Sequence, residues 1–293
     1  MYGPNNLPPG GNPRKVTVPE LRDRKTQGPS IAMVTAYDFT MARLLDEAGV
    51  DVVLVGDSLG MVVQGLSNTL HVTLDEICFQ GRAVARGLRR AHLVGDMPFM
   101  SFQASPERAI ESAGKMMKEG SYESVKIEGG EEIAVHVARM TAVGIPVMGH
   151  VGLAPQRVHA LGGFRVQGKT DDAAERIVAD AIALEQAGAY AVVLEAIPAE
   201  VASRVTRAIG IPTIGIGAGR GCDGQVLVST DLLGMSRGHA PKFVKRFAEL
   251  GDAIVSATRA YVDEVRAGTF PAKEHEYPTG GETPRSVPPA IAH

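Results

Sequence analysis

Acidic side chains close several short apolar segments of this chain, and their positions carry more information than their number. Asp57, Asp96, Glu128 and Glu195 each stand at or just after the end of a run of apolar residues. In barrels of parallel strands the carboxyl ends of the strands meet at one rim, so we expect these carboxylates to converge there. Buried carboxylates need compensating positive charge, and Mg²⁺, which prefers oxygen ligands, supplies it. The pattern therefore predicts a metal site.

The glycines before two of these acids indicate which of them bind the metal directly. Gly56 precedes Asp57 and Gly95 precedes Asp96, and a glycine leaves room beside a strand. We expect Asp57 and Asp96 to be direct ligands and Glu128 to be the third, either directly or through water. The chain has 8 histidines and 2 cysteines without the spacing of a zinc site, which argues against zinc.

A lysine lies two residues before Glu128 in the same apolar segment. Because side chains alternate along a strand, Lys126 and Glu128 should point into the barrel mouth, whereas Val125 and Ile127 should face the helices. A metal with open positions suits a substrate that offers a carboxylate and an adjacent carbonyl, such as a 2-oxo acid. We expect Lys126 to pair with that carboxylate and Glu195 to remove the proton beside the carbonyl.

Several of these residues also have a purely structural interpretation. A single Asp after a strand is commonly a helix N-cap, and for Asp38 this interpretation is favoured. His150 fits a bond to a backbone carbonyl as well as a place in the site. Ser58 lacks the setting of a nucleophile elbow. The GxGxxG match at Gly219–Gly224 is not followed by the long helix of a dinucleotide site, so nucleotide binding is not predicted.

Seven short segments, apolar on both faces, have the pattern of buried parallel strands. They are Ile31–Ala36, Val52–Val55, His92–Val94, Ser124–Ile127, Pro146–Met148, Ala191–Leu194 and Pro212–Ile216. Helix-start signals lie between them, at Thr73, Ser105 and Thr170. This alternation predicts an α/β protein with a (β/α)₈ TIM barrel rather than an open sheet.

The eighth strand has two candidates, Val226–Val228 and Phe243–Phe247. We favour the second, because it leaves room for a last helix from Asp252 to Arg266. We expect residues 1–15 to form an N-terminal arm, residues 16–267 a single barrel domain, and residues 268–293 a tail rich in Pro and Gly.

Composition excludes several classes of protein. A net charge of −3, 5% aromatic residues and no Trp give no basis for nucleic-acid binding. No apolar run approaches the ~18 residues of a membrane helix, and no secretory signal is visible. Two unpaired cysteines, Cys78 and Cys222, fit a reducing cytoplasm.

Nine motifs occur in an order that is specific to one enzyme family. They are Thr35-Ala-Tyr-Asp38, Val55-Gly-Asp-Ser-Leu-Gly-Met61, Gly95-Asp-Met-Pro-Phe-Met100, Val125-Lys-Ile-Glu-Gly-Gly130, Gly149-His-Val-Gly-Leu-Ala-Pro-Gln156, Gly162-Gly-Phe-Arg-Val-Gln-Gly168, Val193-Leu-Glu195, Ile214-Gly-Ile-Gly-Ala-Gly219 and His239-Ala-Pro-Lys-Phe-Val244. Between residues 16 and 270 the chain thus resembles the ketopantoate hydroxymethyltransferases.

The resemblance implies a barrel of the phosphoenolpyruvate/pyruvate type and a homodecamer. It implies transfer of a hydroxymethyl group from 5,10-methylenetetrahydrofolate to 3-methyl-2-oxobutanoate through a Mg²⁺-stabilised enolate, giving 2-dehydropantoate for pantothenate biosynthesis. By position, it implies metal ligands at Asp57, Asp96 and Glu128, substrate contacts at Asp57, Ser58, Asp96 and Lys126, and the proton acceptor at Glu195.

Two alternatives stay open at the level of sequence. A 2-oxo-acid carbon–carbon lyase or a phosphonate mutase would use the same barrel without folate, and a non-catalytic barrel would only bind the oxo acid. No aromatic pair or cationic patch indicates where folate docks. The segment His150–Lys169 is long and rich in Gly for a barrel loop, which predicts a lid.

Overall fold

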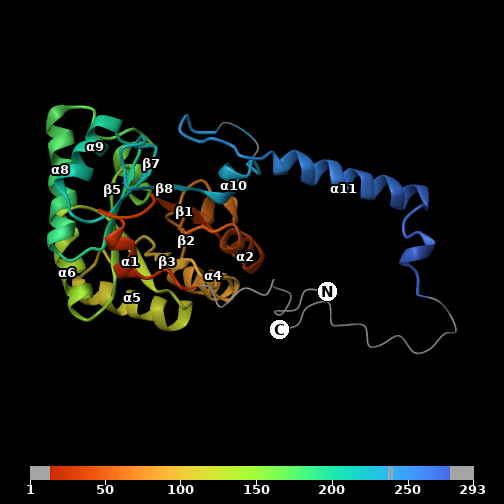
Figure 1. Ribbon diagram of the computed structural model, residues 1–293, viewed down its shortest axis with the longest axis horizontal. Helices are drawn as coiled ribbons and strands as arrows, with labels where there is room; N and C mark the ends of the chain where they lie inside the picture. Colours follow the sequence, from red (N-terminus) through yellow and green to blue (C-terminus); the bar gives the residue numbers. More distant parts are fainter. Residues whose placement is uncertain (1–13, 237, 239, 278–293) are drawn as a thin grey trace.

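The computed structural model describes residues 14–236, 238 and 240–277, and eight parallel strands in chain order close into a barrel (Figure 1). The strands are β1 Ile31–Thr35, β2 Val52–Val55, β3 His92–Asp96, β4 Ser124–Glu128, β5 Val147–Gly152, β6 Ala191–Glu195, β7 Thr213–Ile216 and β8 Gly224–Leu227. The predicted fold class and seven predicted strands are confirmed. Residues 1–13 of the predicted arm and 278–293 of the predicted tail lie outside the described residues.

Helices alternate with these strands. The α-helices are α1 Val18–Asp23, α2 Phe39–Glu47, α3 Leu59–Val62, α4 Leu74–Gly87, α5 Pro106–Gly120, α6 Ala134–Ala142, α7 Val158–Leu161, α8 Asp171–Gln186, α9 Ala199–Ala208, α10 Ser229–Leu232 and α11 Leu250–Ala267, and the 3₁₀ turns are η1 Glu131–Ile133, η2 Pro155–Arg157 and η3 Lys273–His275. In the described ranges, none of these helices combines the length and apolarity needed to cross a membrane.

Local sequence fixes where the main helices begin. Thr73 forms a capping box at the predicted start of α4, and Ser105 and Thr170 accept backbone hydrogen bonds at the predicted starts of α5 and α8. Asp38 caps α2 by accepting a hydrogen bond of 2.8 Å from the backbone N–H of Met41. The structural interpretation of Asp38 is therefore confirmed.

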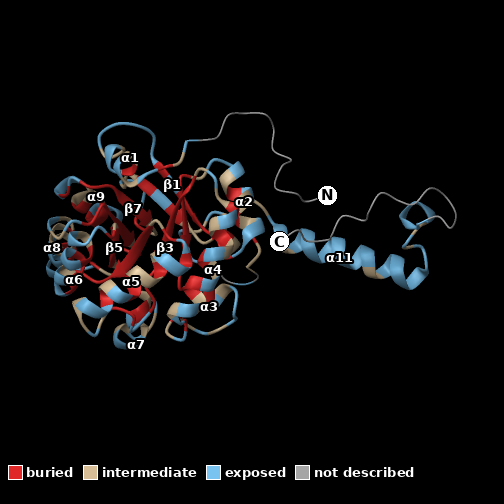
Figure 2. Cartoon of the chain, turned by 90° about the horizontal axis from the view of Figure 1, so that it is seen from below, coloured by how far each residue is buried: buried red, intermediate tan, exposed pale blue. Residues whose placement is uncertain are grey.

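Alternation along the strands produces two apolar layers. On β2, Val52 and Leu54 belong to the cluster inside the barrel, whereas Val53 and Val55 belong to the larger cluster between the strands and the helices. Figure 2 shows these buried residues at the centre of the barrel, surrounded by helices whose outer faces are exposed. Side chains thus fill the barrel interior, and only its carboxyl-terminal end is left to bind ligands.

The eighth strand is Gly224–Leu227, so the favoured assignment to Phe243–Phe247 is wrong. Gly224 pairs with both Ile31 and Ile214, and a Cβ at Gly224 would lie 2.6 Å from the carbonyl oxygen of Ile31. Closure of the barrel therefore requires glycine at this position. Phe247 is instead 64% exposed.

The last long helix does not cover the barrel. The predicted helix is confirmed as α11, but it buries no residue and projects away from the strands (Figures 1 and 2). On the barrel, Ala32 of β1 and Gln225 of β8 are register partners, and both are exposed. This stripe on the outer side of β1 and β8, where an eighth helix would lie, is open to solvent in the described chain.

Asp51 connects three segments at the amino-terminal end of the barrel strands, opposite the rim that carries the acids. Its carboxylate accepts a hydrogen bond of 3.0 Å from the backbone N–H of Ala32 and pairs with Arg24 at 2.8 Å and Arg90 at 2.6 Å. Burial alone would raise the pKa of Asp51, but the Ala32 N–H and the two guanidinium groups outweigh burial and leave the pKa below its ordinary value.

We predict that Asp51→Asn lowers the free energy of unfolding by about 3 kcal/mol at pH 7, because it leaves two guanidinium groups without their shared partner. The folded-state pKa of Asp51 is below the unfolded value of about 3.9, so the carboxylate stabilises the fold above that value and ceases to do so as the pH falls through the folded-state pKa. The difference between wild type and variant should therefore shrink in acid.

Urea unfolding across this pH range checks the prediction. Asp23→Asn, an exposed acid at the end of α1, is the matched control and should change stability by less than about 0.5 kcal/mol. A deficit in Asp51→Asn that stays constant down to about pH 2 would contradict the assignment of the ion pair.

Candidate active site

A pocket of about 110 Å³, here called the barrel pocket, opens at the carboxyl-terminal ends of the strands. All six site residues expected from the sequence line it, namely Asp57, Ser58, Asp96, Lys126, Glu128 and Glu195. His150 also lines it. Residues far apart in the chain therefore converge at one end of the barrel, as the strand-end pattern predicted.

Gly56 and Gly95, which precede Asp57 and Asp96, leave room for different neighbours. A Cβ at Gly56 would lie 2.7 Å from Ser58 Oγ and 3.7 Å from Asp96 Oδ2, so glycine does open room at the site. A Cβ at Gly95 would instead collide with Met116 and Tyr122 in the layer of helices. Gly95 therefore allows close packing of a helix on β3, and the expectation that it opens room for a ligand is corrected.

Lys126 is the positive centre of the barrel pocket. Its Nζ lies 2.8 Å from Asp96 Oδ1 and 3.9 Å from Glu128 Oε1, and these side chains are 3–5% exposed. Burial would lower the pKa of Lys126, but Asp96, Glu128 and Asp57 outweigh burial and raise it. Val125 and Ile127 pack in the layer between strands and helices. The alternation predicted for β4 is confirmed, and the lysine stays an ammonium group.

His150 lies between two of the acids. Its Nδ1 is 3.5 Å from Glu128 Oε1, and its Nε2 is 3.2 Å from Glu195 Oε2. Burial and the nearby Lys126, whose Nζ is 3.2 Å from Nδ1, would lower the pKa of the ring, but the two carboxylates raise it to about 9. The two carboxylates thus favour the charged, imidazolium form of the ring. The interpretation of His150 as a backbone-bonded side chain does not hold.

The acids differ in how fully they are compensated. Burial, and then the charges of Asp96 and Glu128, raise the pKa of Asp57 well above its ordinary value. Burial also raises the pKa of Asp96, despite the adjacent Lys126. For Glu128, burial is outweighed by His150, Lys126 and the backbone N–H of Gln156, so its pKa is lowered. Asp57 and Asp96 are thus the two acids whose ionised form burial still disfavours.

This imbalance fits a divalent cation. With every group ionised, the four acids that surround Lys126 and His150 leave two negative charges in excess, which one divalent ion neutralises. Within the described residues, no three His, Cys, Asp or Glu side chains are arranged as a ready metal cage. Mg²⁺ commonly binds through only one or two carboxylates and keeps its other positions for water and substrate. The residues therefore fit a cation held by Asp57 and Asp96, with Glu128 reached through water.

Gln156 was not anticipated from the sequence. It is 5% exposed, and its Nε2 donates to Asp57 Oδ2 at 3.0 Å and to the carbonyl oxygen of Met97 at 2.9 Å. Its backbone N–H donates to Glu128 Oε2 at 3.1 Å. One loop residue therefore orients two of the expected metal-site carboxylates. The sequence signals were its place at the end of the motif Gly149–Gln156 and inside the predicted lid, and neither assigns it a contact.

Ser58 and Tyr37 complete one side of the barrel pocket. The two hydroxyl groups lie 2.8 Å apart, and burial raises the pKa of Tyr37 to about 12. The phenol therefore stays neutral and holds the Ser58 hydroxyl in place. This partner agrees with a binding role for Ser58 and not with the nucleophile that the sequence had already made improbable.

Comparison of the sequence with known proteins gives the same family for the profile and for the relatives. A family profile described as ketopantoate hydroxymethyltransferase matches residues 15–273. The 3-methyl-2-oxobutanoate hydroxymethyltransferase of Anaeromyxobacter sp. (strain Fw109-5) is 56% identical over 281 residues, which cover 94% of this chain and 92% of that protein. The protein of the same name from Rhodococcus jostii (strain RHA1) is 54% identical over 264 residues, covering 90% and 91%.

Comparison of the fold gives more distant similarities. Phosphonopyruvate hydrolase in complex with oxalate and Mg²⁺ superposes with a TM-score of 0.58 at 14% identity, covering 90% of this chain and 92% of that one. 2,3-Dimethylmalate lyase, a member of the PEP mutase/isocitrate lyase superfamily, gives 0.56 at 16% identity, covering 89% and 92%. At such identities the likeness shows the fold alone, and it confirms the predicted type of barrel.

We predict that Lys126→Met lowers the free energy of unfolding by about 3 kcal/mol or more when divalent cations are removed with a chelator, because it leaves Asp96 and Glu128 buried without their shared cation. Urea unfolding measures the loss. Lys118→Met, on the exposed face of α5, is the control and should cost less than about 0.5 kcal/mol. Equal losses in the two variants would show that the carboxylates do not depend on this ammonium.

Proposed function

The chain belongs to the ketopantoate hydroxymethyltransferase family, and we propose that it transfers a hydroxymethyl group from 5,10-methylenetetrahydrofolate to 3-methyl-2-oxobutanoate. The observation that carries this proposal is the convergence of Asp57, Asp96 and Lys126 beside Glu195 in one pocket. In the overall reaction one water is consumed, a carbon–carbon bond forms at C3, and the products are 2-dehydropantoate and tetrahydrofolate.

In this proposal the oxo acid is bound by a metal ion, by the ammonium group of Lys126 and by the hydroxyl group of Ser58. Asp57 and Asp96 would hold Mg²⁺ or another divalent ion, with Glu128 joining through water, and the ion when bound polarises the 2-oxo group. Lys126 pairs with the substrate carboxylate, since it is a fixed ammonium at the base of the pocket. The Ser58 hydroxyl, held by Tyr37, supplies a further polar contact.

Glu195 is proposed to take the proton from C3. Its Oε2 contacts His150, and its side chain is 20% exposed, so Oε1 is left free to reach a ligand in the barrel pocket. The electron pair left at C3 forms the enolate, which attacks the methylene carbon of the folate. C3 is a weakly acidic tertiary carbon, so its deprotonation requires both the polarised carbonyl and a base held in position.

The alternative lyase or mutase activity rests on the barrel alone. The solved structures with such names are 13–17% identical to this chain, whereas relatives that share over half of the sequence carry the hydroxymethyltransferase name. Turnover that requires folate distinguishes the two activities, because a lyase would consume a single substrate without it.

We also propose that the chain assembles with copies of itself, and we retain the decamer expected from the resemblance. Support comes from α11, which presents Ile254, Tyr261 and Val265 to solvent at 51%, 53% and 45% exposure. The stripe at Ala32 and Gln225 lacks a covering helix within the described chain. In the described residues, the apolar face of α11 does not pack on the barrel, and the barrel face lacks a helix, so the two are complementary surfaces for two copies.

Light scattering coupled to size exclusion tests the assembly. We predict ten chains per particle for the wild type and smaller particles for Ile254→Glu, which places a charge on the apolar face of α11. Arg259→Glu, an exposed position on the same helix, is the control for the added acid. A monomeric wild type would contradict the proposal.

The chemical step is tested by proton exchange without folate. We predict that wild-type protein with Mg²⁺ exchanges the C3 proton of 3-methyl-2-oxobutanoate for deuterium in D₂O, and that Glu195→Gln slows this exchange by at least about 100-fold, the usual contribution of a general base. Proton NMR of the substrate follows the reaction.

The matched control for that experiment is Glu200→Gln, an exposed acid in the first turn of α9 that lines neither cavity. It should exchange at the wild-type rate. Wild-type exchange in Glu195→Gln would remove Glu195 as the base, and no exchange in the wild type would contradict the enolate mechanism itself.

Metal binding is tested by calorimetry. We predict that Asp57→Ala weakens Mg²⁺ binding by at least about tenfold, because it removes one of the two carboxylates proposed to bind the ion directly. Asp38→Ala, which removes an exposed helix cap instead, should bind Mg²⁺ as the wild type does. Equal affinity in Asp57→Ala would overturn the ligand assignment.

A further inference from the structure

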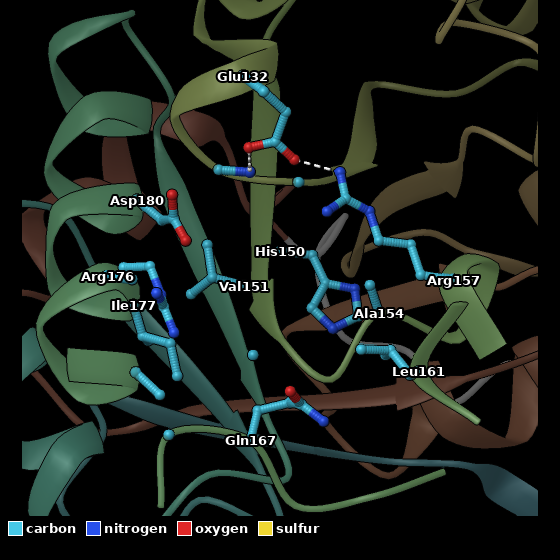
Figure 3. A pocket seen from close by; sticks show the side chains of 15 residues that line it. Glu132, His150, Val151, Ala154, Arg157, Leu161, Gln167, Arg176, Ile177 and Asp180 are labelled. Carbon is cyan, nitrogen blue, oxygen red and sulfur yellow. Dashed lines mark hydrogen bonds and ion pairs between the residues drawn. The ribbon is translucent and has the colours of Figure 1, made fainter. Parts of the chain in front are cut away.

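A second and larger cavity, here called the side cavity, lies beside the barrel pocket and has a volume of about 250 Å³. It is lined by the segment of residues 129–132, the end of β5, one face of α8 and the segment of residues 152–168 (Figure 3). His150 lines both cavities. A ligand in the side cavity would therefore lie next to one in the barrel pocket, with His150 in contact with both.

The side cavity contains a carboxylate with unused hydrogen-bonding capacity. Asp180 is half-buried, and its Oδ1 accepts one hydrogen bond of 3.0 Å from the backbone N–H of Glu131. Within the described residues, its Oδ2 has no partner. Burial, and then the nearby Glu132 and Glu131, raise the pKa of Asp180. A ligand that offers two adjacent N–H donors would satisfy this group better than water does, because charged acceptors form strong paired hydrogen bonds.

A cation lies one helical turn away. Arg176 and Asp180 are four residues apart on α8, yet no ion pair joins them, and Arg176 has no ion-pair partner among the residues described. Arg157, at the opposite side of the side cavity in Figure 3, is already paired with Glu132. Arg176 is thus the guanidinium still able to take an anionic group.

The walls between these polar groups are apolar. Val151 and Ile177 are 4% and 6% exposed and form one wall, and Leu161 lies across from them in Figure 3. A flat bicyclic ring suits such a space. The volume is below the usual range of about 300–1,000 Å³ for sites that enclose a drug-sized ligand, so a folate would place only its ring system inside.

We propose that the side cavity binds the ring system of the folate co-substrate, with Asp180 accepting the hydrogen bonds of its 2-amino-4-oxopyrimidine edge. The opposite edge of the ring, which carries the one-carbon unit, then points toward His150 and the barrel pocket. The glutamate carboxylates lie at the opening, where Arg176 binds them. This inference rests on the proposed function, from which it takes the identity of the co-substrate.

Kinetics of two variants test the position of Asp180. Asp180→Asn keeps an oxygen acceptor for the Glu131 N–H but loses the charge, so the KM for 5,10-methylenetetrahydrofolate should rise by at least about tenfold. Deuterium exchange at C3 of 3-methyl-2-oxobutanoate needs no folate and reports on the barrel pocket separately. Asp172→Asn, the same substitution at an exposed position of α8 outside the side cavity, should leave both measurements at wild-type values.

Folate binding by the Arg176→Ala variant provides a second test, which is valid even if the Asp180→Asn variant does not fold. The variant should bind tetrahydrofolate several-fold more weakly than the wild type, yet bind tetrahydropteroate, which lacks the glutamate, with wild-type affinity. Calorimetry with each of the two compounds measures the difference. Equal weakening for both compounds, or for neither, would overturn the assignment of Arg176.

The outcomes separate this inference from the proposed function. A wild-type chain that exchanges and transfers normally, together with an unchanged KM in Asp180→Asn, would overturn the location of the folate and leave the activity standing. A wild-type chain that transfers no one-carbon unit from 5,10-methylenetetrahydrofolate would overturn the proposed function and this inference together.

Discussion

Lys126 lies among carboxylates in a part of the barrel that excludes water almost completely. Transfer of an ammonium group or a carboxylate into such a place costs several kcal/mol for each ion, and only close pairing offsets the cost. The contact of 2.8 Å with Asp96 and the nearby Glu128 provide that pairing, while His150 compensates Glu128 from its other side. The charges of the rim are therefore mutually dependent, and the positions of the other groups follow from this one requirement.

Strand periodicity and barrel topology explain why much of this arrangement could be predicted. A period of two places Lys126 and Glu128 on the inner face of β4, and parallel strands in a closed barrel must bring their carboxyl ends to one rim. No distance information is needed for either step. The convergence of Asp57, Asp96 and Glu195 follows in the same way, since each lies at the end of a strand or within two residues of it.

What could not be predicted depends on tertiary contacts of short elements whose own sequences carry little pattern. β8 has four residues, begins with a glycine and exposes Gln225, so its sequence has little of the apolar pattern of a buried strand. Phe243–Phe247 was favoured only because it left room for a last helix, and it forms no strand. Gln156 acquires its role only when its loop folds back over Asp57 and Glu128, and nothing in the neighbouring residues specifies that fold.

His150 forms part of the wall of two cavities at once. Any rotation of its ring that improves the fit of a ligand on one side also changes the shape offered on the other side. Thermodynamic linkage then makes the effect reciprocal: the factor by which the first ligand alters the affinity of the second equals the factor by which the second alters the affinity of the first. A single imidazole between two compartments is thus sufficient to couple their occupancy, without movement of a domain or a subunit.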